Sequence, residues 1–322
     1  MRTLFYILSF LLLCLSTVPT EFVSFAHEPG LAAKVHDQNK RVVSAFWGEE
    51  QRGVSSKHAL HLSTRAAFLV NMTTGQVYYE FNADKGMAPA SLTKLVTLYL
   101  IYEALDHGAL SWGTPIPISA QAIQTGGANM SLVQGEKVAL AELVKGMSVI
   151  SANNACVAMS EYLTQGNPAR FIRQMNDKAK TLGMTKTVFK NVHGLPAVGQ
   201  ISTARDLAQL AMSYIQRFPQ ALALHSLATH TYQGTTHSNP NTLLRSYPGL
   251  DGLKTGFVSA SGYSIVATAK RGDLRLLAVV LGAATAQVRH EETIKLLDYG
   301  FQQARDEEFD SQDLEAQKRQ DR

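Results

Sequence analysis

The order of strand-like and helix-like patterns constrains the fold of this chain more than any other feature of its sequence. Two apolar runs of strand length, at residues 65–70 and 76–80, flank a Thr-Thr-Gly turn and predict a hairpin. Three more strand-like runs follow much later, at residues 253–257, 263–269 and 274–281. Because a long helical stretch separates the two groups, the pattern predicts an α+β sandwich whose antiparallel sheet is built from both ends of the chain.

The helical patterns between and after the strands have apolar residues at helical spacing. They are expected at residues 91–107, 139–163, 168–182, 202–218 and 288–301. The second pattern is interrupted around residues 148–151, so we expect two pieces there. Ser202 and Thr203 can cap the start of the fourth helix.

Composition and charge exclude some classes of function. The chain has 322 residues, of which 45% are hydrophobic, which is enough apolar surface for one large globular domain. Its net charge is only +4, and Lys and Arg are spread along it without the basic runs that are typical of nucleic-acid-binding proteins. We therefore expect no nucleic-acid partner.

The N-terminal residues have the pattern of a secretory signal peptide. Arg2 precedes an apolar run at residues 4–15, and Ser24-Phe25-Ala26 has the small-x-small pattern of a cleavage site. The run is shorter than the ~20 residues that a transmembrane helix needs. We expect residues 1–26 to be removed on export, with a cut near residue 16 as the alternative. The mature protein is then expected in the periplasm or cell envelope.

The segments that flank the predicted domain carry no chemistry of their own. Residues 27–61 form a polar, irregular lead-in, and residues 304–322 form a charged tail, either frayed or a loose helical extension. The tail has no amphipathic membrane anchor, so none is expected after signal removal. Because Cys14 leaves with the signal peptide, Cys156 remains alone, packed in a helix, and no internal disulfide can form.

Ser91-Leu92-Thr93-Lys94 places a serine and a lysine three residues apart at the start of a predicted helix. That spacing puts both side chains on one face, about one turn apart. A serine hydroxyl becomes a nucleophile when a base removes its proton, and lysine can be that base when burial or another cation lowers its pKa. Alone, the pattern is more typical of a helix cap beside a solvated lysine.

Two later motifs change that interpretation. Ser151-Ala152-Asn153 lies at the break between helical pieces, and Lys254-Thr255-Gly256 lies within an apolar strand. A lysine in such a strand is costly unless it faces a polar site, and a glycine there permits close approach of another backbone or a substrate. Each motif alone fits a polar helix break or a strand end. The three together, in this order, indicate one site.

The three motifs together resemble those of the penicillin-recognising serine acyltransferases, which are the penicillin-binding proteins and the serine β-lactamases. The surrounding segments look like those of the low-molecular-mass D-alanyl-D-alanine carboxypeptidases, at residues 90–95, 151–155, 191–195, 202–208 and 251–256. The resemblance implies a β-lactamase/transpeptidase-like catalytic domain at residues 62–303, in which helices and a helical subdomain flank the sheet.

The resemblance also implies a role for the residues on the helical side. Ser91 would attack the carbonyl between the two D-alanines of a peptidoglycan stem peptide, and Lys94 would take its proton. Ser151 would relay a proton to the leaving amine, and Asn153 would hold the substrate amide. Water would then hydrolyse the acyl-enzyme, so that the net reaction removes the terminal D-alanine. Penicillins and other β-lactams would acylate the same serine.

The strand motif would bind the other end of the substrate. The resemblance implies that Lys254 and Thr255 bind the terminal carboxylate, a task that suits a cation beside a hydroxyl donor. The backbone N–H groups of Ser91 and Phe257 would form the oxyanion hole. Arg289 matches an arginine that the family uses near the carboxylate, with a surface arginine at a helix start as the alternative.

Departures from the family pattern leave other activities open. Asn154 stands where aspartate is common, Ala152 where glycine is common, and Phe257 where the residue is often polar. A class A β-lactamase needs a loop glutamate, yet residues 162–205 hold one acidic residue, Asp177, in a predicted helix. A D,D-endopeptidase or a catalytically idle penicillin-binding scaffold would keep the same motifs.

No cofactor or metal is expected. His290-Glu291 is not followed by a second histidine at helical spacing, and the other histidines are scattered along the chain.

Overall fold

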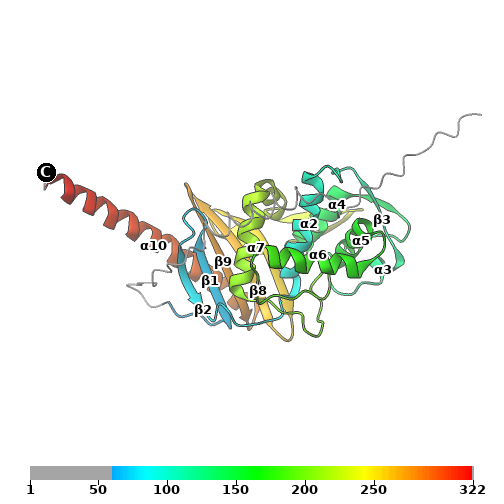
Figure 1. The fold of residues 1–322 in the computed structure, drawn as a ribbon, viewed down its shortest axis with the longest axis horizontal. Coiled ribbons are helices and arrows are strands. Elements are labelled where there is room, and N and C mark those ends of the chain that lie inside the picture. The colour runs from blue at the N-terminus through cyan, green and yellow to red at the C-terminus, as the bar shows by residue number, and fades with distance from the viewer. Residues whose placement is uncertain (1–59, 321–322) are drawn as a thin grey trace, which may run out of the picture.

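The computed structural model describes residues 60–320, and the side chains of residues 60–308. The predicted signal peptide and nearly all of the predicted lead-in lie outside the described residues. Within the described part, strands come before and after a helical middle in the sequence, and in space these strands join in one sheet (Figure 1). The α+β class is thereby confirmed.

One five-stranded antiparallel sheet forms the centre of the domain, with the strand order β2-β1-β9-β8-β7. Its strands are β1 (Ala66–Asn71), β2 (Val77–Phe81), β7 (Leu250–Val258), β8 (Gly262–Arg271) and β9 (Leu274–Ala283). Because β1 pairs with β9, the first described strand lies beside the last. β7, which carries the Lys-Thr-Gly motif, lies at an edge of the sheet.

Successive side chains of each strand point to opposite faces of the sheet, and helices cover both faces. Phe68 of β1 packs in a core that includes residues of α2 (Lys94–Asp106) and α7 (Ala204–Arg217). The next residue, Leu69, packs in a second core that includes residues of α10 (Ala286–Gln320). The sheet is therefore the middle layer between two helical layers.

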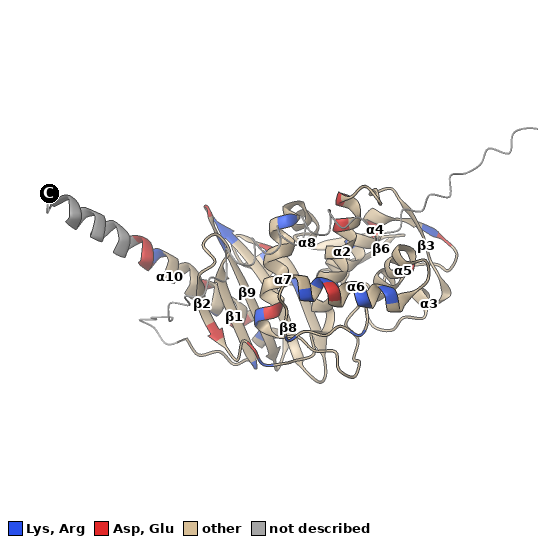
Figure 2. Cartoon of the chain, viewed as in Figure 1, with Lys and Arg blue, Asp and Glu red and all other residues tan. Residues whose placement is uncertain are grey.

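Five helical elements form a region beside the sheet (Figure 1). They are α3 (Ala120–Ile123), α4 (Leu140–Lys145), the π-helical turn η2 (Gly146–Ile150), α5 (Asn153–Thr164) and α6 (Pro168–Thr181). The pattern at residues 139–163 is thus divided near the expected interruption. Figure 2 shows basic and acidic residues intermixed along α6, so this surface helix carries both signs of charge.

Several short elements have no counterpart among the sequence predictions, because they are too short to show a periodic pattern. They are β3 (Pro115–Pro117), β4 (Lys137–Ala139), η3 (Pro219–Ala221), α8 (Leu222–His225), β5 (Thr229–Tyr232), β6 (Thr235–Ser238) and α9 (Leu243–Ser246). β3 pairs with β4, and β5 pairs with β6, as two small two-stranded sheets outside the main sheet.

Helix α2 is the central helix of the domain. Its buried residues do not form a single stripe, which is typical of a helix that is packed on all sides. The 3-10 helix η1 (Ala90–Thr93) leads directly into it. The Ser-x-x-Lys motif therefore lies at the end of a rigid, buried element.

Helix α10 continues to Gln320, beyond the predicted end at residue 301. Of the two forms expected for the charged tail, frayed or helical, its described residues have the helical one. Figure 1 shows the last part of this helix extending away from the sheet. Among the residues that the structure describes, no helix is both long and apolar enough to cross a membrane.

Candidate active site

Ser91 lies in η1, in a turn whose backbone departs from helical geometry. Ala90, just before it, has a φ of 50°, in the left-handed region. Two glycines make room for this turn. A Cβ on Gly194 would collide with the Ala90 carbonyl oxygen, and a Cβ on Gly256 would lie 3.2 Å from the Ser91 nitrogen. The loop that contains Gly194 and the strand β7 therefore both pack closely against the nucleophile turn.

Lys94 is the first residue of α2, and its side chain is fully buried. Its Nζ lies 3.0 Å from Ser91 Oγ, 2.7 Å from Asn153 Oδ1 and 2.6 Å from the His193 carbonyl oxygen. The Asn153 amide is oriented by its Nδ2, which donates to the Gly126 carbonyl at 2.7 Å. The structure thus brings three predicted site residues together and excludes a solvated lysine.

The environment of Lys94 suits it to accept a proton. Burial lowers its pKa to about 8, and the nearby Cys156 acts in the opposite direction. The Asn153 amide oxygen and the His193 carbonyl can only accept hydrogen bonds. A neutral lysine has two N–H groups, which these two oxygens take, so the lone pair faces the Ser91 hydroxyl.

Ser151 lies at the predicted helix break. It ends η2 with a φ of 66°, in the left-handed region, and α5 begins two residues later at Asn153. Ser151 Oγ is buried and has no hydrogen-bond partner within the described residues. A buried hydroxyl without a partner is costly and is often found at functional sites. The bond between Lys94 and Asn153 fixes this break beside the Ser91 turn.

A loop at residues 126–130, which sequence reasoning missed, completes the helical side. Asn154 Nδ2 donates to the Met130 carbonyl at 2.9 Å, and Asn154 Oδ1 accepts from the Met130 nitrogen at 3.1 Å. An amide can do both, whereas the aspartate that is common here could only accept. The sequence signal that could have revealed this loop is the pair Gly126-Gly127, since a Cβ on Gly127 would lie 2.6 Å from Asn153 Nδ2.

Lys254 lies on β7 with 2% of its surface exposed, and Thr255 beside it is also buried. The pKa of Lys254 lies well below its usual value, first because of burial and then because of the charges of Lys94 and Arg289. No acidic side chain of the described residues forms a salt bridge with any of these three cations. Buried positive charge of this kind favours the binding of an anion.

Arg289 and Phe257 complete the strand side. Arg289 belongs to α10 and is only 7% exposed, so it is not a surface arginine. One of its terminal nitrogens donates to the Pro240 carbonyl at 3.1 Å, while its Nε has no partner within the described residues. Phe257 is half-exposed after the Lys-Thr-Gly motif, with its ring centroid 4.3 Å from that of Tyr263. Its part in an oxyanion hole stays a prediction.

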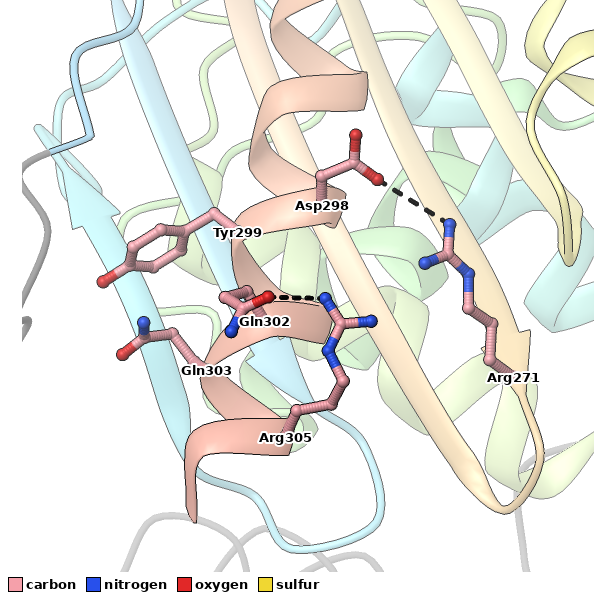
Figure 3. Close-up of a pocket in the computed structure, with 6 residues that line it drawn as sticks. All are labelled: Arg271, Asp298, Tyr299, Gln302, Gln303 and Arg305. Carbon is pink, nitrogen blue, oxygen red and sulfur yellow. Dashed lines mark hydrogen bonds and ion pairs between the residues drawn. The ribbon is translucent and has the colours of Figure 1, made fainter. Parts of the chain in front are cut away.

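A separate hollow of about 430 Å³ lies against α10 and contains none of the predicted site residues (Figure 3). It is lined by Arg271, Asp298, Tyr299, Gln302, Gln303 and Arg305. Its polar groups bind one another, since Arg271 pairs with Asp298 and Arg305 donates to Gln302. The described residues contain no group of three or more His, Cys, Asp or Glu side chains that could hold a metal ion.

The fold and the site define a class of protein. A serine at the start of a buried central helix, bonded to a buried lysine and faced by a Lys-Thr-Gly edge strand, is the arrangement of the penicillin-recognising serine acyltransferases. The sequence profile of peptidase family S11, described as D-alanyl-D-alanine carboxypeptidase, matches residues 53–285. The chain belongs to this family.

Individual relatives agree with this assignment. The D-alanyl-D-alanine carboxypeptidase DacC of Escherichia coli is 40% identical over 247 residues, which cover 74% of this chain and 62% of the relative. The crystal structure of penicillin-binding protein 6B from Escherichia coli has 35% identity and a TM-score of 0.74, covering 79% of this chain and 82% of that one. Penicillin-binding protein D2 from Listeria monocytogenes, in its ampicillin-bound form, has 36% identity and a TM-score of 0.69, and the match covers 76% of this chain and 100% of that one. The chain thus spans less than two thirds of the length of DacC.

Proposed function

We propose that this chain is a serine D-alanyl-D-alanine carboxypeptidase, which removes the terminal D-alanine from peptidoglycan stem peptides through an acyl-enzyme on Ser91. The observation that carries the proposal is the 3.0 Å hydrogen bond between Ser91 Oγ and the fully buried Lys94. Membership of the D-alanyl-D-alanine carboxypeptidase family supports the substrate class.

In the first step, a neutral Lys94 accepts the proton of Ser91 as Oγ attacks the carbonyl carbon of the penultimate D-alanine. An ester C–O bond forms, and the C–N bond to the terminal D-alanine breaks. The leaving nitrogen takes a proton that passes from Lys94 through Ser151, whose buried hydroxyl has no other partner within the described residues. The backbone N–H groups of Ser91 and Phe257 stabilise the oxyanion.

The substrate is held at both sides of the scissile bond. Its free carboxylate binds to Lys254 and Thr255 with Arg289 beside them, and the support is the buried positive charge of this region. Asn153 holds the substrate amide. Its Nδ2 donates one hydrogen to the Gly126 carbonyl, so the second hydrogen remains for a substrate carbonyl.

Water then hydrolyses the ester and regenerates Ser91. Penicillins acylate the same serine, and slow release is expected. Asp177, the acidic residue in the stretch where a class A β-lactamase has its glutamate, has 72% of its side chain exposed and lies 3.8 Å from Lys180. An exposed carboxylate on the surface of α6 cannot activate a water molecule at Ser91. This favours peptide over antibiotic as the hydrolysed substrate.

The proposal includes the place of action, which is the periplasm or cell envelope after removal of residues 1–26. The support is the signal-peptide pattern and the cell-wall substrate class of the family. Residues 62–303 form the catalytic domain in this proposal. Mass spectrometry of the exported protein tests it, since an intact Met1 terminus would contradict cleavage.

The activity is tested on the purified mature protein with a fluorescent penicillin and a D-Ala-D-Ala peptide. We expect a covalent label on the Ser91 peptide and release of free D-alanine, and the S91A variant should show neither. A folded protein that takes no label would contradict the proposal. Labelling without D-alanine release would favour a D,D-endopeptidase or an idle scaffold, which crosslinked muropeptides distinguish, and rapid penicillin turnover would favour a β-lactamase.

A further inference from the structure

His225 is a buried histidine that lies against the strand of the Lys-Thr-Gly motif. It is the last residue of α8 and is 1% exposed. Its Nδ1 lies 3.0 Å from the Leu253 carbonyl oxygen, and its Nε2 lies 3.2 Å from the Tyr214 hydroxyl. Leu253 directly precedes Lys254, so the imidazole contacts the backbone one residue before the cation of the candidate carboxylate site.

The two hydrogen bonds fix the state of the ring. A carbonyl oxygen can only accept, so Nδ1 carries the proton, and Nε2 of the neutral ring accepts from the Tyr214 hydroxyl. Burial, followed by the charge of Lys254, lowers the pKa of His225 to about 3, which keeps the ring neutral at the pH of the cell envelope. His225 therefore joins α7, α8 and β7 through one fixed tautomer.

The start of β7 depends on such side-chain contacts. The pairing of β7 with β8 shifts register just before Gly252, so the regular ladder is interrupted there. The ladder resumes at Gly252 and includes Leu253 and Lys254, and side chains support the backbone beside the interruption. Arg275 donates two 2.8 Å hydrogen bonds to Asp251, and Asn241 Nδ2 donates to the Gly252 carbonyl at 3.4 Å. His225 makes the last of these contacts before the functional residues begin.

Lys254 itself has little to hold its side chain in place. Its Nζ donates to the carbonyl of its neighbour Thr255 at 3.1 Å. The charged and titratable groups that act on it are Lys94, Arg289, Cys156 and His225, and a positive charge on either of the first two repels it. The position of the ammonium group is therefore set by the strand that carries it.

We propose that His225 is a positioning residue for Lys254. By holding the Leu253 carbonyl, the imidazole sets the position of Lys254 relative to Ser91 and to the substrate carboxylate. This inference rests on the proposed function, for which it identifies the support of the carboxylate site. Small displacements of a binding group have large kinetic effects, since about 1 Å of misplacement can cost roughly a hundredfold in rate.

Two amide variants separate this role from simple packing. In H225N, the side-chain amide can place a donor at the position of Nδ1, which keeps the bond to Leu253 and loses the bond to Tyr214. In H225Q, the longer side chain reaches the position of Nε2 and has the opposite effect. H225F fills the space and keeps neither bond. Because the two amides have similar polarity, their comparison remains informative if H225F is unstable.

For a D-Ala-D-Ala peptide we expect H225Q and H225F to lower kcat/KM by roughly ten- to a hundredfold, mainly through KM, with H225N within about threefold of wild type. Equal losses in H225N and H225Q, or an unchanged kcat/KM in a folded H225F, would overturn the proposal.

The rate of penicillin acylation separates this proposal from the proposed function. Penicillin carries a carboxylate and reacts with the same serine. Its second-order rate constant of acylation should therefore be close to wild type in H225N and lower in H225Q and H225F. If the wild type reacts with penicillin but releases no D-alanine, the proposed function fails while this order still supports His225. If all variants are acylated at the wild-type rate, the role of His225 is wrong whatever the peptide activity.

Discussion

The two lysines of the active site are held in different ways. Lys94, on the helical side, has three oxygen partners within 3.0 Å and begins a helix that is buried on all sides. Lys254, on the strand side, donates to the carbonyl of the next residue and faces other cations. One lysine is fixed by its own contacts, whereas the other is fixed by the backbone of an edge strand.

This difference indicates a division of labour. The helical side has its hydrogen bonds in place before a substrate arrives, as preorganised chemistry requires. The strand side has buried positive charge that an anion would complete. Changes on the helical side should therefore lower kcat, and changes on the strand side should mainly raise KM.

The largest effect is expected from S91A. Removal of the nucleophile should reduce D-alanine release by about a millionfold, as loss of the serine does in other serine hydrolases, and should abolish penicillin labelling. The fold should be unchanged, because the Ser91 hydroxyl bonds to Lys94 and not to the core. Mass spectrometry after penicillin treatment checks the label, with circular dichroism as the control. A penicillin label on Ser151 in S91A would mean that Ser151, and not Ser91, is the nucleophile.

Loss of the base should have the next largest effect. K94M is expected to slow acylation by roughly a hundred- to ten-thousandfold, the range for removal of a general base. In the wild type, the rate should rise with pH and level off above about 8, because the neutral form of Lys94 accepts the proton. K85M, at an exposed lysine, is the matched control. A wild-type rate that does not change between pH 6 and 8 would exclude Lys94 as the base.

The sequence predicted the long elements well and the short ones poorly. The start of α7 was visible because Thr203 caps it, accepting a hydrogen bond from the backbone nitrogen of Asp206. The strands of the small two-stranded sheets and α8 have too few residues for a pattern. Their positions depend on tertiary contacts, and so α8 and its His225 could not be recognised as part of the site.

The site itself was predictable where its chemistry lies in contiguous motifs. Ser91, Lys94 and Asn153 come together as expected, and Lys254 is close enough for the charge of Lys94 to lower its pKa. What the motifs could not show is the contribution of backbone groups, such as the His193 carbonyl on Lys94. A backbone oxygen has no signature in the sequence, because every residue carries one.

On the strand side, R289Q tests the binding of the carboxylate. We expect KM for a D-Ala-D-Ala peptide to rise by roughly tenfold, with a smaller change in kcat, since a hydrogen bond to a charged group contributes about 1.5–3 kcal/mol. The control is the peptide with a C-terminal amide, which should be a poor substrate of the wild type and should lose little more in the variant. An equal loss for both peptides would mean that Arg289 acts on the fold and not on the carboxylate.

The smallest expected effect concerns stability in acid. His225 has a folded-state pKa of about 3, whereas an unfolded histidine has about 6.5. Between these values the unfolded chain binds a proton that the folded protein does not, so stability falls as the pH is lowered. At pH 5.5 this amounts to about 1 kcal/mol relative to neutral pH.

The support of the strand side is therefore expected to be acid-sensitive, and H225N should remove that part of the pH dependence. His193, on the helical side, has a pKa of about 4 and contributes in the same direction, so some sensitivity should remain. Urea unfolding of both proteins at pH 7.5 and 5.5 measures the difference. H225N is expected to be less stable at both values, but its loss between them should be smaller than that of the wild type. Equal losses would mean that His225 binds a proton in the folded state, and the fixed tautomer that holds Leu253 would then be wrong.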